Sequence, residues 1–217
     1  MLLVLLVFPI PTAFAVPANK PGKAKKIKEA LAEIVAQEKA PGIVAAITSS
    51  KGALAIGAAG IRKFGGNKKL TERDLIHLGS CTKAMTSVLL ATLVTEDKLT
   101  WETSLIETLP ELKGTIDPQY YSITLWQLLT HRSGVAANAA NWWAHGKMGL
   151  MKRRLKILTE NLKEAPTLKQ GAYHYSNLGY LIAGCMAEKV TGSSWESLMQ
   201  KRIFDPLGMD SAGFGPP

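Results

Sequence analysis

Residues 79–95 read GSCTKAMTSVLLATLVT, a run of small and apolar residues with a single charged residue inside it. That residue is Lys83, the only Asp, Glu, Lys or Arg between Asp74 and Glu96. The pattern predicts a largely buried helix from Ser80 to Thr95. Because a lone ammonium group in a buried helix is costly, Lys83 needs a partner or a use.

Ser80 is the partner that the spacing offers to Lys83. Residues three apart lie on one face of a helix, so the two side chains can meet in its first turn. A desolvated lysine has a lowered pKa and can accept the serine proton, and a helix N-terminus favours the negative charge that develops. Gly79 leaves room for a substrate to approach. The alternative is that Ser80 only caps the helix and that Lys83 extends along its surface to the solvent.

A second candidate group is Tyr175-Ser176-Asn177, which opens a helical pattern that runs to Val190. Residues two apart in an extended chain project to one side, so a phenol and a carboxamide can enter the same cleft. Near an ammonium group the pKa of a tyrosine falls, which makes Tyr175 a candidate general base or proton relay. Asn177 could hold Lys83 or a substrate amide. The alternative is a capping asparagine beside a packed tyrosine.

Four stretches of the chain form a pattern together: SCTK at 80–83, LLTHRSG at 128–134, YSN at 175–177 and PLGM at 206–209. In this pattern the chain resembles the class C β-lactamase-related family of the serine β-lactamase and penicillin-binding-protein superfamily. The resemblance covers Ile27 to Phe214. That family contains class C β-lactamases, D-Ala-D-Ala carboxypeptidases, related esterases and D-amino-acid peptidases.

The resemblance implies a serine hydrolase that works through an acyl-enzyme and needs no cofactor. Ser80 would attack a carbonyl group, Lys83 and Tyr175 would move its proton, and Asn177 would orient the substrate. The Ser80 N–H would supply half of an oxyanion hole. The substrate would be a β-lactam, a D-alanyl peptide or a small ester, and the sequence does not choose among them.

One motif of the family has no candidate in the expected place, namely Lys-Thr-Gly or His-x-Gly on a late strand. Because that strand supplies the second oxyanion donor, we expect the chain as given to be inactive or nearly so. A non-catalytic module that binds penicillin or cell-wall peptides is the alternative function, and a gene fragment without a stable fold is a third possibility. The presence of Ser80, Lys83 and Tyr175 favours the enzyme.

The order of the elements predicts an α+β fold, because a helix and two strands come before a mostly helical stretch. The first helix is predicted at 27–38 and the strands at 42–48 and 53–59, with later helices at 80–95, 124–130, 147–163, 177–190 and 195–202. The resemblance implies a helical lobe and an α/β lobe, with Ser80 at their junction and an antiparallel sheet that is incomplete here. Residues 27–217 would then be the N-terminal two thirds of a hydrolase domain.

The N-terminus predicts export. Residues 1–15 form an uncharged apolar run that ends in Ala13-Phe14-Ala15, a small-x-small pattern typical of signal peptidase sites. We therefore predict a signal peptide at 1–15, a basic leader at 16–26 and a secreted or periplasmic protein. The run is too short and too interrupted by proline to predict a stable membrane span.

Composition indicates an ordinary globular domain of 217 residues, with 47% hydrophobic and 20% charged residues. Its formal charge of +9 would suit an anionic surface, but the dispersed basic residues do not resemble a nucleic-acid reader. The four histidines lack metal-binding spacing, and no nucleotide-binding glycine motif occurs. We therefore expect a small-molecule or peptide substrate, no cofactor, no metal and a monomeric chain.

The remaining features of the sequence have structural interpretations. Cys81 and Cys185 are predicted to be free, buried thiols. His131, inside the LLTHRSG stretch, is interpreted as structural rather than catalytic. Trp142-Trp143 and Tyr120-Tyr121 could line a substrate rim, but half-buried packing is the favoured interpretation for both pairs. On the helix at 147–163, we expect Lys152, Arg153 and Lys156 on a solvated face opposite Leu150, Met151, Leu155, Leu158 and Leu162.

Overall fold

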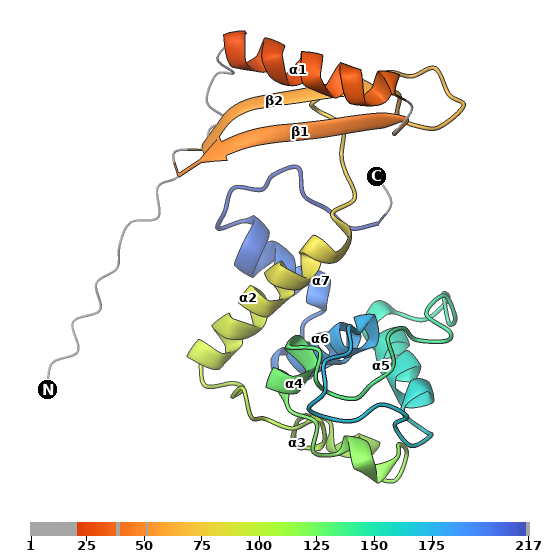
Figure 1. Ribbon diagram of the computed structural model, residues 1–217. Helices are drawn as coiled ribbons and strands as arrows, with labels where there is room; N and C mark the ends of the chain where they lie inside the picture. The colour runs from red at the N-terminus through yellow and green to blue at the C-terminus, as the bar shows by residue number, and fades with distance from the viewer. Residues whose placement is uncertain (1–20, 38–39, 51, 216–217) are drawn as a thin grey trace, which may run out of the picture. The chain divides into compact units, whose positions relative to one another are not determined.

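The computed structural model describes residues 21–37, 40–50 and 52–215, which fall into two compact units (Figure 1). One unit contains the chain up to His77 together with the residues from Leu207 onward, and the other contains Leu78 to Pro206. Among the described residues, helices are combined with a two-stranded antiparallel sheet, which confirms the predicted α+β class. The predicted signal peptide at 1–15 and the first part of the predicted leader, 16–20, lie outside the described residues.

In the first unit, helix α1 (Pro21–Ala36) lies along a hairpin of strands β1 (Gly42–Ser49) and β2 (Gly52–Gly60) (Figure 1). The strands pair from Gly42 opposite Gly60 to Ser49 opposite Gly52, with an irregularity between Ile47 and Thr48. A Cβ atom at Gly57 would lie only 2.8 Å from Ile27 Cγ2, so glycine at this position lets α1 approach the sheet closely.

Both predicted strands are confirmed to within one residue at each end. Helix α1, however, begins at Pro21 and not at Ile27, so residues 21–26 of the predicted basic leader are helical. Proline is favoured in the first turn of a helix, where its missing N–H costs nothing. The predicted end of this helix, Glu38, lies outside the described residues.

The second unit is helical. A 3₁₀ turn η1 (Gly79–Cys81) leads into α2 (Thr82–Thr95). The later helices are α3 (Leu105–Thr108), α4 (Leu125–Leu129), α5 (Leu150–Asn161), α6 (Asn177–Thr191) and α7 (Trp195–Met199). Shorter turns are η2 (Pro110–Leu112), η3 (Pro118–Tyr120) and the π-helical η4 (Gln200–Phe204). The predicted helices of this part are present, but the one predicted at 147–163 spans only Leu150–Asn161, and the one predicted at 195–202 becomes π-helical after Met199. The elements α3, η2 and η3 were not anticipated.

Helix α6 forms the centre of this unit, because most of its residues from Leu178 to Glu188 are buried. It packs against α2, α4 and α5, whose inward leucines and isoleucines include Leu89, Leu93, Leu128, Ile157 and Leu158. Ser176 caps α6 by accepting a hydrogen bond from the Gly179 N–H, and Gly192 ends it in the left-handed conformation. Both ends of the helix that carries Asn177 are therefore fixed by local sequence.

Three predictions about exposure are wrong in part. Val88 of α2 is 56% exposed, so this helix is not buried on all sides. Leu150 is 49% exposed, although it was placed on the buried face of α5. Arg153, placed on the solvated face with Lys152 and Lys156, instead donates hydrogen bonds to the carbonyl oxygens of Ala144 and Trp142. A loop packed beside the first turn of α5 makes this difference, and periodicity along one helix cannot reveal such a loop.

Candidate active site

Ser80 lies in η1, immediately before α2, and Lys83 lies one turn further along. The Lys83 Nζ donates a hydrogen bond to Ser80 Oγ over 3.3 Å, as the spacing of the two residues predicted. Gly79 has a φ of +54°, a conformation that L side chains rarely adopt, so the turn that presents Ser80 requires glycine. Local sequence thus builds the first half of the site.

The second half comes from the segment that enters α6. The Tyr175 hydroxyl donates a hydrogen bond to Ser80 Oγ over 2.6 Å. Lys83 Nζ donates a second hydrogen bond, to Asn177 Oδ1, over 2.6 Å. All four residues proposed from the sequence therefore meet at one place, although nearly a hundred residues separate the two motifs.

The charge of Lys83 dominates the electrostatics of this cluster. Its Nζ lies 4.8 Å from the centre of the Tyr175 ring and 5.5 Å from that of Tyr180. Lys83 and, to a smaller extent, the Ser80 hydroxyl stabilise the phenolate and lower the pKa of Tyr175 below its ordinary value. Tyr175 is 42% exposed, so solvent reaches this side chain. A hydroxyl between an ammonium group and a phenol of lowered pKa can be deprotonated and act as a nucleophile.

The LLTHRSG stretch supports the Tyr175 segment. His131 Nδ1 accepts a hydrogen bond from the Ser176 N–H over 3.1 Å, and the His131 carbonyl accepts one from the His174 N–H over 2.8 Å. The Arg132 carbonyl accepts a hydrogen bond from the Gly171 N–H, and Arg132 Nη1 donates one to the Gly171 carbonyl. Burial and the nearby Lys83 lower the pKa of His131, which favours the neutral imidazole that can accept this hydrogen bond. These contacts agree with the structural interpretation of His131.

Sequence reasoning missed two residues of this neighbourhood. Asn138 Oδ1 accepts a hydrogen bond from Asn177 Nδ2 over 2.7 Å, which turns the Asn177 oxygen toward Lys83. The Tyr180 hydroxyl donates to the Leu129 carbonyl over 3.0 Å and lies 3.0 Å from Ser87 Oγ. Tyr180 lies one turn after Asn177 on α6, a spacing that could have indicated it. No signal in the sequence pointed to Asn138.

The family of the chain follows from a comparison with protein-family models. A family model described as Beta-lactamase matches residues 27–217. The chain belongs to this family. The resemblance inferred from the four motifs is thereby confirmed.

The curated proteins that resemble this chain in sequence include a penicillin-binding protein and an esterase. The chain is 26% identical to penicillin-binding protein 4 of Amycolatopsis lactamdurans, over 70% of its own length and 39% of the relative's. It is 29% identical to the lovastatin esterase of Penicillium rubens, over 66% of its own length and 40% of the relative's. The chain thus spans about two fifths of the length of these curated relatives.

A solved structure of an octameric penicillin-binding protein homologue from Pyrococcus abyssi has a similar fold. The TM-score is 0.68 with 25% identity, and the match covers 88% of this chain and 44% of the other. The β-lactamase/transpeptidase fold that was predicted is therefore confirmed.

A pocket of about 230 Å³ lies beside the cluster in the helical unit. It is lined by residues of the η1–α2 segment (Gly79, Thr82, Lys83 and Thr86), of α6 (Tyr180, Leu181 and Gly184), and by Arg154 and Trp195. The Trp195 indole N–H donates to Thr86 Oγ1 over 3.3 Å, so part of the wall is held by a hydrogen bond. Lys83 borders both the pocket and Ser80.

Other predicted features near the site have mixed outcomes. Both cysteines are free thiols, but Cys81 is exposed, because it lies at the start of α2 beside Ser80, whereas Cys185 is buried as predicted. Tyr120 is buried as predicted, but Trp142 and Trp143 are 64% and 65% exposed, which contradicts their packed interpretation. Within the described residues, no three His, Cys, Asp or Glu side chains are grouped as metal ligands. In the same part of the chain, no helix is long and apolar enough to cross a membrane.

Proposed function

We propose that this chain carries the nucleophile of a serine hydrolase that cleaves an amide or an ester through an acyl-enzyme on Ser80. The observation that carries the proposal is the 2.6 Å hydrogen bond between the Tyr175 hydroxyl and Ser80 Oγ, together with the Lys83 contact at 3.3 Å. This arrangement gives the serine a proton acceptor and a compensating charge at the same time.

In the proposed reaction Ser80 Oγ attacks the substrate carbonyl carbon while its proton passes to the Tyr175 phenolate. Lys83 stabilises the phenolate before this transfer and is itself held by Asn177. The Ser80 N–H stabilises the tetrahedral oxyanion, and collapse of that intermediate breaks the bond to the leaving amine or alkoxide, which takes the proton from Tyr175. Water then cleaves the acyl-enzyme and restores Ser80.

The relatives span more than one substrate class, since one is named a penicillin-binding protein and another an esterase. We therefore propose a β-lactam, a D-alanyl peptide or a small ester as substrate, with no cofactor. We further propose that the protein is secreted or periplasmic and monomeric, whereas the homologue from Pyrococcus abyssi is described as octameric.

The experiment is covalent labelling, followed by the intact mass of the protein. The chain is incubated with a fluorescent penicillin or with a fluorophosphonate, and the S80A and S87A variants are treated in the same way. Ser87 is the matched control, because it lies on α2, bonds to the Lys83 carbonyl and has no proposed role in catalysis. We expect one adduct on the wild type and on S87A, and none on S80A.

Labelling that persists in S80A would remove Ser80 as the nucleophile. The lifetime of the penicillin adduct then bears on the two candidate functions, whereas the phosphonate adduct does not turn over in either case. Release with turnover supports the hydrolase and contradicts the prediction that this chain alone turns over substrate slowly or not at all. A penicillin adduct that persists agrees with that prediction and with the alternative, a penicillin-binding or sensor module for cell-wall peptides.

A further inference from the structure

The segment before α5 exposes an unusual amount of apolar surface. Trp142 and Trp143 are 64% and 65% exposed, and their rings meet edge to face with centres 5.9 Å apart. Met148 and Leu150, which follow in the same segment, are 38% and 49% exposed. Large apolar side chains that gather on a surface indicate an interaction site more often than chance exposure does.

Polar contacts hold this segment in place, so the exposure is a property of the fold. Arg153 donates from Nε to the Ala144 carbonyl over 2.9 Å and from Nη2 to the Trp142 carbonyl over 3.0 Å. His145 Nε2 lies 2.9 Å from Glu160 Oε2. These bonds connect Trp142, Ala144 and His145 to α5, while the rings of Trp142 and Trp143 stay exposed to solvent.

The surroundings of the two tryptophans are cationic. No acidic residue occurs between Asp117 and Glu160, whereas Lys147 and Lys152 are exposed within this stretch. The Glu160 carboxylate is already bonded to Asn141, His145 and Lys156. Along the chain, the two exposed tryptophans are therefore followed by two exposed lysines, and none of the ion pairs seen among the described residues involves these lysines.

We propose that this surface binds the anionic phospholipid headgroups of a membrane. The surface is called the tryptophan patch below and is formed by Trp142, Trp143, Lys147, Met148, Leu150 and Lys152. Indole rings favour the level of the headgroups, where their apolar body and polar N–H are both satisfied. Lysines beside them gain from the negative potential of an anionic leaflet. An acidic protein would satisfy the lysines but would leave the pair of exposed indoles unexplained. The contact is peripheral, and it does not depend on the proposed catalytic function.

The experiment measures partition of the full chain onto vesicles. Vesicles of phosphatidylglycerol mixed with phosphatidylcholine are compared with vesicles of phosphatidylcholine alone, by co-sedimentation and by tryptophan fluorescence. We expect binding to the anionic vesicles that weakens with salt. Subtracting the W142A/W143A emission spectrum from that of the wild type isolates the emission of the two indoles. The maximum of this difference spectrum should move to shorter wavelength when vesicles are added.

Matched variants separate the patch from the rest of the chain. W142A/W143A should weaken partition by about tenfold or more, and K147Q/K152Q by roughly thirtyfold, because each lysine near an anionic surface contributes about 1 kcal/mol. The controls are W126A, which removes another tryptophan that is 52% exposed, and K113Q/K201Q, which removes two exposed lysines elsewhere. Both controls should bind within about twofold of the wild type.

Several results would overturn the proposal. These are no binding to anionic vesicles, partition unchanged in W142A/W143A with no shift of the indole emission, or equal binding to both kinds of vesicle. Binding of poly-glutamate through the patch without binding of vesicles would assign the surface to an acidic protein partner instead. Melting temperatures of all variants confirm that a change in binding does not arise from unfolding.

Discussion

The chemistry of Tyr175 depends on the two side chains beside it. Its phenol contacts the Ser80 hydroxyl, and Lys83 lies over its ring, so a positive charge and a hydrogen bond both favour the phenolate. The pKa of Tyr175 is accordingly lowered from the ordinary value for tyrosine. In the proposed mechanism the phenolate is the form that accepts the serine proton, so a lowered Tyr175 pKa would allow Ser80 to react at lower pH.

Replacing Lys83 by glutamine should raise the pKa of Tyr175 back toward its ordinary value, because the stabilising charge is lost while the phenolate remains the charged form. The measurement is an ultraviolet titration of the phenolate, with the Y175F spectrum subtracted. The onset of ionisation should move to higher pH in K83Q, and with it the alkaline onset of any acylation. The Y173F substitution is the control, because the Tyr175 shift should be the same when K83Q and its reference both carry it. An unchanged Tyr175 titration in K83Q would show that Lys83 does not set this pKa.

Contacts that follow from local spacing could be predicted from the sequence. Ser80 and Lys83 share a helical turn, and Tyr175 and Asn177 share one side of an extended segment, so their pairing needed little tertiary information. Asn138 could not be predicted, because its contact with Asn177 depends on where a loop is placed. The exposure of Cys81 likewise follows from its position in a turn at the start of α2.

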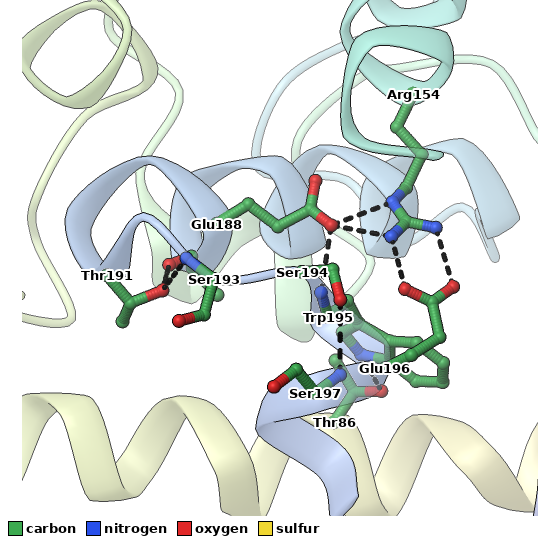
Figure 2. Close-up of polar contacts among 10 residues, drawn as sticks. Thr86, Arg154, Glu188, Thr191, Ser193, Ser194, Trp195, Glu196 and Ser197 are labelled. Atoms are coloured by element: carbon green, nitrogen blue, oxygen red, sulfur yellow. Dashed lines mark hydrogen bonds and ion pairs between the residues drawn. The ribbon is translucent and has the colours of Figure 1, made fainter. Parts of the chain in front are cut away.

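At the scale of the elements, one ion-pair network joins several helices of the second unit (Figure 2). Arg154 of α5 donates to Glu188 of α6 and to Glu196 of α7. Glu188 Oε1 also accepts from the Trp195 N–H over 2.9 Å, and the Trp195 indole reaches Thr86 of α2. Burial opposes the charge of Arg154, but hydrogen bonds to the two glutamates outweigh it and raise the pKa of the guanidinium.

Loss of Arg154 should destabilise the fold by about 3–5 kcal/mol, because it leaves Glu188 buried without its cation. Glu188 is 3% exposed, so water cannot replace the missing partner. Urea denaturation of R154M measures the change in the free energy of unfolding. The control is K189M, which removes the surface ion pair between Lys189 and Glu111 and should cost less than about 1 kcal/mol. If both variants lose the same small amount, the network contributes no more than a surface pair.

The helices that carry this network were predicted from hydrophobic periodicity, but the network was not. Arg154 lies in a run of four basic residues among five positions, and such a run normally indicates a solvated surface. Its burial depends on two glutamates from later helices, which the sequence does not place. For the same reason the anchoring role of Arg153 and the exposure of Trp142 were missed. Periodicity locates elements, whereas the partners of polar side chains follow from packing.

At the scale of the whole molecule, the family and the fold were predictable because the four motifs occur in the order that the family shows and are spread over most of the chain. The net charge of +9 does not by itself indicate a binding surface. The structure adds that exposed lysines and exposed tryptophans lie in one segment of the chain. A cell-wall substrate would require that the protein leave the cytoplasm, whereas anionic lipids are available on both faces of a membrane. Export is therefore the whole-molecule property on which the proposed cell-wall substrate depends.

We expect signal peptidase to cleave the chain between Ala15 and Val16, because small residues at Ala13 and Ala15 follow an uncharged apolar run. The intact mass and N-terminal sequence of protein recovered from the periplasm or medium of a bacterial host measure the cleavage site. A13E/A15E should accumulate unprocessed chain, since the peptidase requires small residues at these positions, whereas A18S beyond the site should be processed normally. Full-length protein that stays in the cytoplasm of the wild-type strain would contradict export. It would also restrict the tryptophan patch to the inner face of the membrane, where anionic lipids are equally available, and would remove cell-wall peptides from the candidate substrates.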